Sequence, residues 1–296
     1  SPQGQWLAVG TSTKSVVVCQ WCRGGDAPRL WGQFGDLFQA GVVAVQAHPT
    51  HCSLLLASSM DASHALLWVE GGEGQCKVLQ HFHDHSKFVV RVCWSPDGRY
   101  FATASYDHSL NLYRFDTDLL HTELLDKLEF RSNVEAIAFS PDSKTLVLSC
   151  LEDCMLRYLD LDSLEVTQVN TNACEDLHVS FSILDLCFSQ DGSMLLAATD
   201  KGRLILFEAG THHQLRNFFG EFRSQITSQP RCALSPDGLV AYTTSQSSCD
   251  LLAFDVCTQK LLRTLPGHSK SPRSLIMLPG GALLSSSFDG TVREWS

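Results

Sequence analysis

One short string in this sequence carries the residue types that bind metal ions. His81-Phe82-His83-Asp84-His85 alternates histidine with other residues and includes a carboxylate. Because alternate residues of an extended strand point to one face, such a string could hold zinc or copper. No further ligand follows at a recognisable spacing, so we predict neither a metal site nor a bound cofactor.

A second string, Cys19-Gln20-Trp21-Cys22, has the spacing of thiol chemistry. Zinc sites of this kind need a second CxxC, which the sequence lacks, and redox sites place the thiol at a helix start. The twelve cysteines are scattered, and some lie inside apolar runs, as Cys93 and Cys187 do. Buried free thiols are typical of reducing compartments, so we expect a cytoplasmic or nuclear protein.

Overall charge and the missing motifs limit the possible functions. Twenty-two Lys and Arg against thirty-two Asp and Glu give a formal charge of −10, with no basic block. This balance disfavours nonspecific binding to nucleic acid or to anionic membranes, and no run approaches the ~18 apolar residues of a membrane helix. The sequence has no P-loop, no GxGxxG after a strand, no GxSxG and no HExxH. We therefore predict that the protein is not an enzyme.

The elements that would position any site follow from an internal repeat. An apolar stretch followed by Ser-Pro or a related pair recurs seven times, at intervals of 43 to 49 residues. A near-constant period of this length is typical of repeated four-stranded units. The seven pairs are Ser1-Pro2, His48-Pro49, Ser95-Pro96, Ser140-Pro141, Ser189-Gln190, Ser235-Pro236 and Leu278-Pro279.

The third copy illustrates the structure that each repeat predicts. Its apolar run Val89–Trp94 is a strand, and Ser-Pro-Asp-Gly after it is a tight turn. Further strands are predicted over Tyr100–Ser105 and Leu110–Phe115, with a turn at Asp107 between them. An outer strand near Leu125–Phe130 completes one antiparallel sheet.

Seven such sheets predict an all-β fold, a seven-bladed β-propeller of four-stranded antiparallel blades, because packing neighbours buries both faces of each sheet. We expect one domain over residues 1–296. Its repeats are approximately 1–34, 35–82, 83–130, 131–177, 178–225, 226–266 and 267–296. The first copy lacks an inner strand and the last lacks an outer one. We therefore expect the sequence to be an excerpt of a larger chain whose preceding segment supplies them.

The last copy opens with Gly267-His268, has Ser287-Phe288-Asp289-Gly290 in its middle and closes with Trp295. With this signature the repeats resemble those of the WD-repeat family along essentially the whole chain. The resemblance implies that His, Ser, Asp and an aromatic residue are linked by hydrogen bonds inside each blade, as a structural network and not a catalytic one. It also implies drift in other copies, where Leu159, Phe207 and Phe254 replace the usual Trp. The network residues are His268, Ser287, Asp289 and Trp295 in the last copy, His85, Ser105, Asp107 and Tyr113 in the third, and Ser59, Asp61 and Trp68 in the second.

The resemblance further implies a scaffold that binds a protein or peptide on the top face of the propeller. Met60, Tyr106 and Phe288 directly precede the turn Asp and are expected to point outward. Aromatic residues and Met are enriched where proteins bind proteins. Cations on the loops entering the inner strands would favour an acidic or phosphorylated partner. These are Lys87, Arg131, Arg231, Lys270 and Arg273. The alternative is a propeller hydrolase or other enzyme with a site in the central channel.

Overall fold

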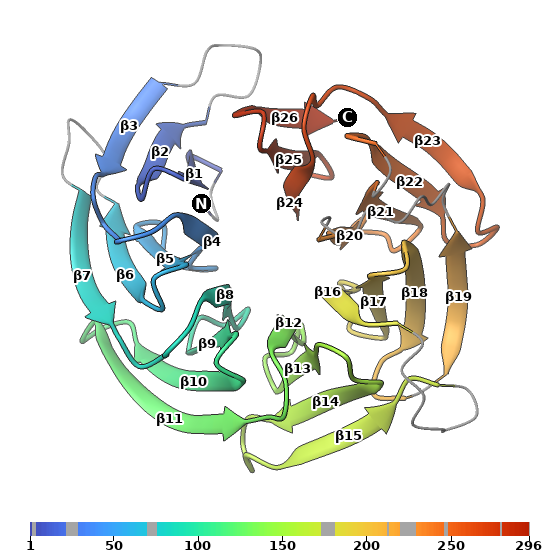
Figure 1. Cartoon of the computed structure of the whole chain (residues 1–296), viewed down its shortest axis with the longest axis horizontal. Helices are drawn as coiled ribbons and strands as arrows, with labels where there is room; N and C mark the ends of the chain where they lie inside the picture. The colour runs from blue at the N-terminus through green and yellow to red at the C-terminus, as the bar shows by residue number, and fades with distance from the viewer. Residues whose placement is uncertain are drawn as a thin grey trace. The chain divides into compact units, whose positions relative to one another are not determined.

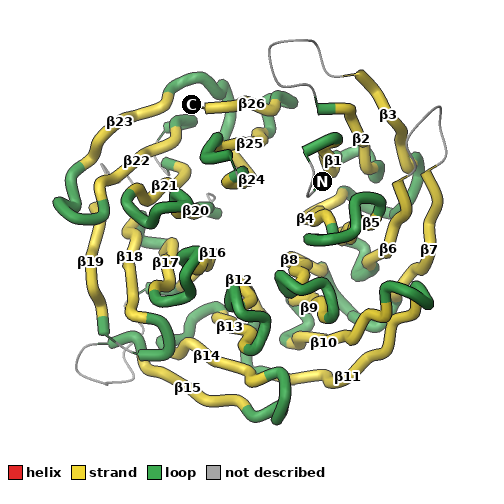
Figure 2. Tube along the Cα trace, turned by 180° about the vertical axis from the view of Figure 1, so that it is seen from behind, coloured by secondary structure: helices red, strands yellow, loops and turns green. Residues whose placement is uncertain are grey.

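The computed structural model describes residues 1, 4–21, 29–69, 76–172, 181–211, 213–219, 229–245, 248–278 and 280–295. In these residues all regular structure is β-strand (Figure 2). None of them belongs to a helix that is long and apolar enough to cross a membrane. The chain divides into two compact units, Ser1–Phe139 and Ser140–Ser296, referred to below as unit 1 and unit 2.

In its described residues, unit 1 contains β1 to β12. Their bounds are β1 Trp6–Gly10, β2 Val16–Gln20, β3 Arg29–Phe34, β4 Val42–Ala47, β5 Leu54–Ser59, β6 His64–Val69, β7 Cys76–Phe82, β8 Val89–Trp94, β9 Tyr100–Ser105, β10 Ser109–Asp116, β11 His121–Glu129 and β12 Val134–Phe139.

Unit 2 contains β13 to β26 in the part of it that the structure describes. Their bounds are β13 Thr145–Cys150, β14 Met155–Asp160, β15 Val166–Asn170, β16 Ile183–Phe188, β17 Met194–Thr199, β18 Arg203–Glu208, β19 Gln214–Phe219, β20 Cys232–Leu234, β21 Val240–Thr244, β22 Leu251–Asp255, β23 Leu261–Leu265, β24 Pro272–Met277, β25 Leu283–Ser287 and β26 Val292–Trp295.

Within each sheet, consecutive strands pair with one another, as short turns between extended segments predict. In Figure 1 the sheet β8-β9-β10-β11 runs from an inner to an outer strand, and β4-β5-β6-β7 does the same. The strands form seven antiparallel blades in chain order, so the predicted fold class, the all-β propeller of seven blades, is confirmed. The first sheet, β1-β2-β3, and the last, β24-β25-β26, each have three described strands.

The third repeat shows how closely turn chemistry and alternation locate the strands. Val89–Trp94 and Tyr100–Ser105 are strands with the predicted bounds, and the third strand is longer by one residue at each end, Ser109–Asp116. The outer strand begins at His121, four residues before the predicted start. A bulge where Tyr113 pairs with Leu124 bends it, and bulges carry no clear sequence signal.

The core of unit 1 lies between successive sheets. Every residue of β5 is buried, because the strand has a neighbouring sheet on each face. Leu55 and Ala57 pack toward the first sheet, with Trp6 and Val16. Leu54 and Leu56 point to the opposite face, where they pack with residues of β8, β9 and β10. Two-sided burial explains why this strand is an unbroken apolar run.

Candidate interaction site

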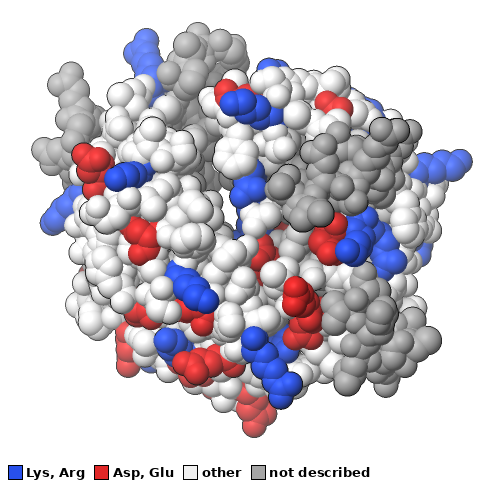
Figure 3. Space-filling view, viewed as in Figure 1, with Lys and Arg blue, Asp and Glu red and all other residues white. Residues whose placement is uncertain are grey.

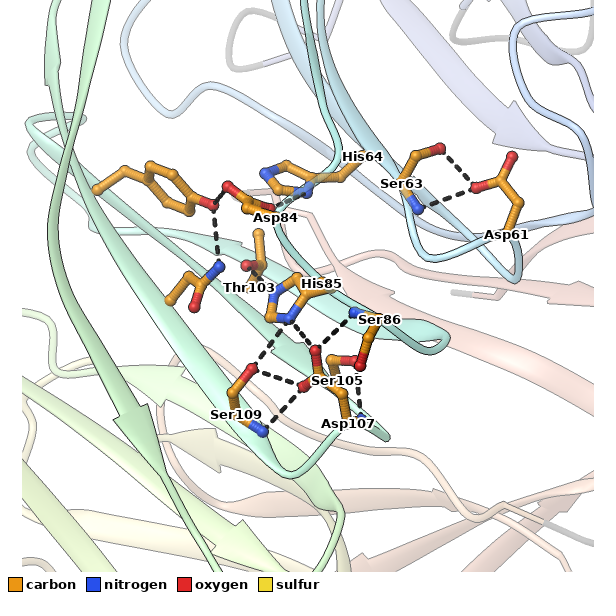
Figure 4. A network of polar contacts seen from close by, with 12 residues as sticks. Asp61, Ser63, His64, Asp84, His85, Ser86, Thr103, Ser105, Asp107 and Ser109 are labelled. Atoms are coloured by element: carbon orange, nitrogen blue, oxygen red, sulfur yellow. Dashed lines mark hydrogen bonds and ion pairs between the residues drawn. The ribbon is translucent and has the colours of Figure 1, made fainter.

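The turn between the second and third strands of the third blade is held by one carboxylate. Asp107 accepts hydrogen bonds from the backbone N–H groups of Ser86 (2.9 Å) and Ser109 (3.0 Å) and from the Ser109 hydroxyl (2.5 Å) (Figure 4). Its Oδ2 also lies 3.0 Å from Nδ1 of His85. Burial alone would raise the pKa of this carboxyl, but these partners lower it to about 2, so it is ionised at neutral pH.

The hydroxyl that bridges this network is not the predicted one. Nε2 of His85 lies 2.8 Å from Oγ1 of Thr103, whereas the Ser105 hydroxyl donates to the carbonyl of Lys87 (3.1 Å) and accepts from the Asp107 N–H (3.1 Å). Thr103 and Ser105 lie on the same face of β9 because they are two residues apart. Ser105 thus ties the turn to the loop entering the inner strand and does not contact the histidine.

The last blade repeats this arrangement. His268 lies 2.9 Å from Asp289 through Nδ1 and 2.7 Å from the Ser285 hydroxyl through Nε2. Nε1 of Trp295 donates to the same hydroxyl (2.9 Å), which completes the chain of four. Ser287, the predicted bridge, donates instead to the carbonyl of Lys270 (2.7 Å).

The second blade keeps the turn carboxylate but not the rest of the network. Asp61 accepts from the backbone N–H groups of Gln39 (2.5 Å) and Ser63 (2.9 Å), and Ser59 accepts from the Asp61 N–H (3.3 Å). Trp68 is one residue beyond the network position. Leu55 pairs with Leu67, as Phe101 pairs with Tyr113 in the third blade. Trp68 was predicted in the network because Trp is the usual residue there, but strand register places Leu67 at that position.

A second polar cluster, which the sequence did not reveal, lies beside the third-blade network. Its members are His64, Asp84, Tyr113 and Asn111. Asp84 accepts a short hydrogen bond from the Tyr113 hydroxyl, to which Asn111 Nδ2 donates (3.2 Å), and its Oδ1 lies 3.7 Å from Nδ1 of His64 (Figure 4). The His64 ring is fully buried and stacks on Phe82 with centroids 4.4 Å apart. Burial, followed by the neighbouring histidines, holds the His64 pKa well below its usual value, so the ring is neutral.

Three blades share a hydrogen bond that presents the residue before the turn Asp. The N–H of Met60 donates to the carbonyl of Gly41 (3.1 Å), that of Tyr106 to Phe88 (3.0 Å), and that of Phe288 to Ser271 (3.3 Å). Each bond joins the turn to the loop entering the inner strand of the same blade. We call these turns and loops the top loops of each unit.

The top loops of unit 1 carry an apolar surface. Met60 is 45% exposed and Phe88 41%. Tyr106 is half-buried, and its ring centroid lies 6.3 Å from that of Phe88. Lys87 and Arg131 are exposed on the loops entering β8 and β12. Phe88 was not among the predicted site residues, although it directly follows Lys87 in the loop.

In unit 2 the predicted residues separate into two environments. Phe288 is 62% exposed, and the guanidinium carbon of Arg273 lies 5.0 Å from the centre of its ring, within cation–π range. Lys270 is exposed in the same loop. Arg231 is not a surface cation: its side chain is 9% exposed, with Nη1 3.6 Å from Asp185 and Nε donating to the carbonyl of Arg273 (2.8 Å). Arg231 thus points inward, toward Asp185 of the neighbouring inner strand β16.

The role of these surface residues in partner binding stays a prediction. On the face seen in Figure 3, basic and acidic side chains are interspersed over a mainly uncharged surface. A ligand would therefore meet both signs of charge over short distances on that face.

The two strings that could perform metal or thiol chemistry have other surroundings. His85 belongs to the Asp107 network, and Nε2 of His81 lies 2.9 Å from the carbonyl of Leu37. Within the described ranges, no three His, Cys, Asp or Glu side chains converge as a metal site requires. In the CxxC string, Cys19 is a half-buried free thiol of β2, and Cys22 lies outside the described residues.

The fold and the recurrent Asp turn define a β-propeller whose third and last blades have a His–Asp–hydroxyl hydrogen-bond network. Residues 76–114, 123–160 and 259–296 match the family model described as WD domain, G-beta repeat. Three segments of the chain thus match WD repeats, as the resemblance implied.

Its curated relatives carry different names and cover different shares of this chain. The chain is 27% identical over 200 residues to pre-mRNA-processing factor 17 of Homo sapiens, covering 67% of this chain and 32% of that protein. It is 26% identical over 238 residues to the target of rapamycin complex subunit wat1 of Schizosaccharomyces pombe, covering 66% and 72%. A segment of 86 residues is 37% identical to actin-interacting protein 1 of Drosophila melanogaster, covering 28% and 13%. The chain spans about a third of the length of pre-mRNA-processing factor 17.

Proposed function

We propose that this protein is a non-catalytic scaffold that binds a protein or peptide partner through its top loops, as part of a larger complex. Two of the relatives are named as a complex subunit and as an actin-interacting protein, which supports a role in assembly. The same relatives support a nuclear or cytoplasmic location. The described cysteines are free thiols, which favours a reducing compartment of either kind.

The observation that carries this proposal is the exposure of large apolar side chains on a rigid frame. Met60, Phe88 and Phe288 are 41 to 62% exposed, while backbone hydrogen bonds fix the turns that hold them. A side chain presented from a fixed backbone loses little conformational entropy when a partner covers it. Aromatic residues in such positions supply much of the binding energy of protein interfaces.

The histidines that would be the first candidates for acid–base catalysis are already engaged. His85 and His268 each use both ring nitrogens within the blade, toward an Asp and a hydroxyl. Both rings are buried. A general base must reach a substrate proton, so this arrangement favours a structural role for both histidines and supports the scaffold function over the alternative of an enzyme.

Pull-down from cell extract with variants of the top loops tests the proposal. We expect Phe88→Ala with Tyr106→Ala in unit 1, or Phe288→Ala in unit 2, to lower partner capture at least tenfold, as for loss of an aromatic anchor. The Tyr106→Ala, Phe288→Ala double variant should abolish it. Mass spectrometry identifies the partners that differ.

Matched controls remove equally exposed apolar side chains from other loops. Leu119 follows β10 and is 75% exposed, and Leu239 precedes β21 and is 52% exposed. Both turns are at the ends of the blades opposite to the top loops, because successive strands are antiparallel. Leu119→Ala and Leu239→Ala should leave capture unchanged. Equal capture by all variants would place the partner elsewhere on the molecule.

A further inference from the structure

Four Ser-Pro pairs lie entirely within the described residues, and one of them differs from the others in the surroundings of its serine. The pairs begin at Ser95, Ser140, Ser235 and Ser271. Ser-Pro is the dipeptide on which proline-directed serine/threonine kinases act. The surroundings of each hydroxyl therefore decide which of the four pairs such an enzyme can reach.

Three of the hydroxyls are enclosed in the tight turn that follows an inner strand. Each donates to an Asp two residues later: Ser95 to Asp97 (2.6 Å), and Ser140 and Ser235 to their own turn Asp (2.5 Å). Each also accepts from the N–H of the residue five positions on, at 2.9 to 3.0 Å. Ser95 is fully buried and Ser140 is 9% exposed. Phosphorylation there would require the blade to open and would put two negative groups together.

Ser271 is exposed, in the top loop that enters β24. Among the described residues, no hydrogen bond to its hydroxyl is found, in contrast to the other three. Its carbonyl accepts from the Ser287 hydroxyl (3.2 Å) and the Phe288 N–H (3.3 Å), and both distances are slightly longer than usual for hydrogen bonds of their type. Pro272 restricts Ser271 to extended backbone and itself has no N–H to satisfy. Ser271 itself is thus extended, between a bend at Ser269 and Lys270 and Pro272, the buried first residue of β24.

We propose that Ser271 is a phosphorylation site for a proline-directed serine/threonine kinase. In the transfer, Oγ of Ser271 attacks the γ-phosphorus of the nucleoside triphosphate, which the kinase supplies with Mg²⁺. The new Oγ–P bond forms as the bond between the γ-phosphorus and the β,γ-bridging oxygen breaks, and the nucleoside diphosphate leaves. The hydroxyl proton passes to the catalytic carboxylate of the kinase.

Phosphorylation would change the charge of this top loop. Lys270 and Arg273 flank the dipeptide, and Arg273 lies over the Phe288 ring. Arg273 is the extra residue of a bulge in β24, since Pro272 pairs with Ser287 and Ser274 with Ser286. A phosphoserine carries about −1.5 to −2 charges at pH 7, enough to neutralise both cations and to compete with the ring for Arg273. This consequence rests on the proposed function, because it weakens capture of an acidic partner at the same loop.

The test is phosphorylation of the folded chain by a proline-directed serine/threonine kinase and MgATP, with sites located by mass spectrometry. We expect Ser271 to be phosphorylated at least tenfold faster than Ser95, Ser140 or Ser235. Ser271→Ala should lower incorporation to background, and Pro272→Ala should do the same while keeping the hydroxyl. In the urea-unfolded chain, returned to assay conditions just before labelling, the other three serines should gain phosphate.

Two results would overturn the site. In the first, the kinase phosphorylates Ser95, Ser140 and Ser235 of the folded chain as fast as Ser271. In the second, Ser271 of the folded chain is not phosphorylated. A synthetic peptide of residues 266–277 locates the cause of the second result, in the fold if the peptide is labelled and in the local sequence if it is not. None of these measurements involves a binding partner. They can therefore disprove phosphorylation of Ser271 without disproving the scaffold function, and the pull-down can disprove the scaffold function without disproving phosphorylation.

Discussion

The second and third blades share a turn and differ in what lies behind it. Asp61 and Asp107 each accept a backbone N–H from the loop entering the inner strand and another from the residue two positions on. Behind Asp107 is the polar column His85, Thr103 and Tyr113. The equivalent residues behind Asp61, matched by these hydrogen bonds and by strand register, are Phe38, Ala57 and Leu67, all buried.

The difference shows that the Asp turn forms without the histidine network, which is present behind the turn in the third blade and absent in the second. Apolar side chains need no hydrogen-bond partners and are stabilised by packing alone. Phe38, Ala57 and Leu67 pack in this way within one core cluster. A polar column must be complete, because each buried group left without a partner costs more than a matched pair contributes. The third blade should therefore tolerate single substitutions in the column less well than the second.

Removing the turn carboxylate should show the largest difference between the two blades. Asp107→Ala leaves His85 buried without its Asp and should lower the free energy of unfolding by about 3 kcal/mol. Asp61→Ala removes the same backbone contacts but leaves no histidine unpaired, so we expect about 1.5 kcal/mol. Urea unfolding followed by tryptophan fluorescence measures both. Equal losses would mean that the histidine adds nothing to the turn.

Placing the second-blade residues in the third blade tests whether the polar column is stable only when all of its hydrogen-bond partners are present. His85→Phe alone removes one hydrogen-bond partner from Thr103 and one from Asp107 and should cost about 2.5 kcal/mol. The double variant His85→Phe, Thr103→Ala recreates the pair Phe38 and Ala57 and should be more stable than the single variant. A double variant that loses the sum of the two single effects would contradict this coupling.

Acid should destabilise the second blade through His48. Its ring is fully buried, Nδ1 accepts from the His51 N–H (2.9 Å), and Nε2 lies 3.1 Å from the Gly98 carbonyl. Burial is the largest cause of its low pKa, about 4 against 6.5 when unfolded. Below pH 6.5 the unfolded chain therefore binds more protons, so stability falls with falling pH and levels off below about pH 4.

The size of this effect is about 2 kcal/mol between pH 6.5 and 4.5 at 1.36 kcal/mol per pKa unit. His48→Asn keeps an acceptor for the His51 N–H but removes the titrating group. This variant should be less stable at pH 7 and should lose less stability on acidification, as urea unfolding at each pH would show. The same acid slope in both proteins would assign the loss to other groups.

The smallest effect should be the same in both blades. Ser59 and Ser105 each accept the N–H of the turn Asp and donate to the loop entering the inner strand. Ser59→Ala and Ser105→Ala should each lower the unfolding free energy by about 1 kcal/mol, since neither serine contacts a histidine. Thermal unfolding of the pair provides the comparison. A much larger loss for Ser105→Ala would place that serine within the network after all.

How far the site could be predicted from sequence depended on how local each interaction is. The turn at Asp107 follows from turn residues close together in the chain, and the pairing of His268 with Asp289 was implied by the family resemblance. The bridging hydroxyl did not, because Ser285 and Ser287 lie on the same face of β25 and alternation cannot separate them. Arg231 was predicted at the surface, yet Asp185, from another blade of unit 2, pairs with it.

The sequence by itself determined the seven repeats, the strands and the Asp turns, because these depend on periodicity and on turn residues close together in the chain. Only the tertiary structure decided that Phe38 replaces a histidine, that Tyr113 meets Asp84, and that Ser271 alone among the four Ser-Pro serines is exposed. Each of these depends on which blade packs against which. The physical reason is that burial and hydrogen-bond partners are fixed by neighbours distant in sequence, which a local pattern does not encode.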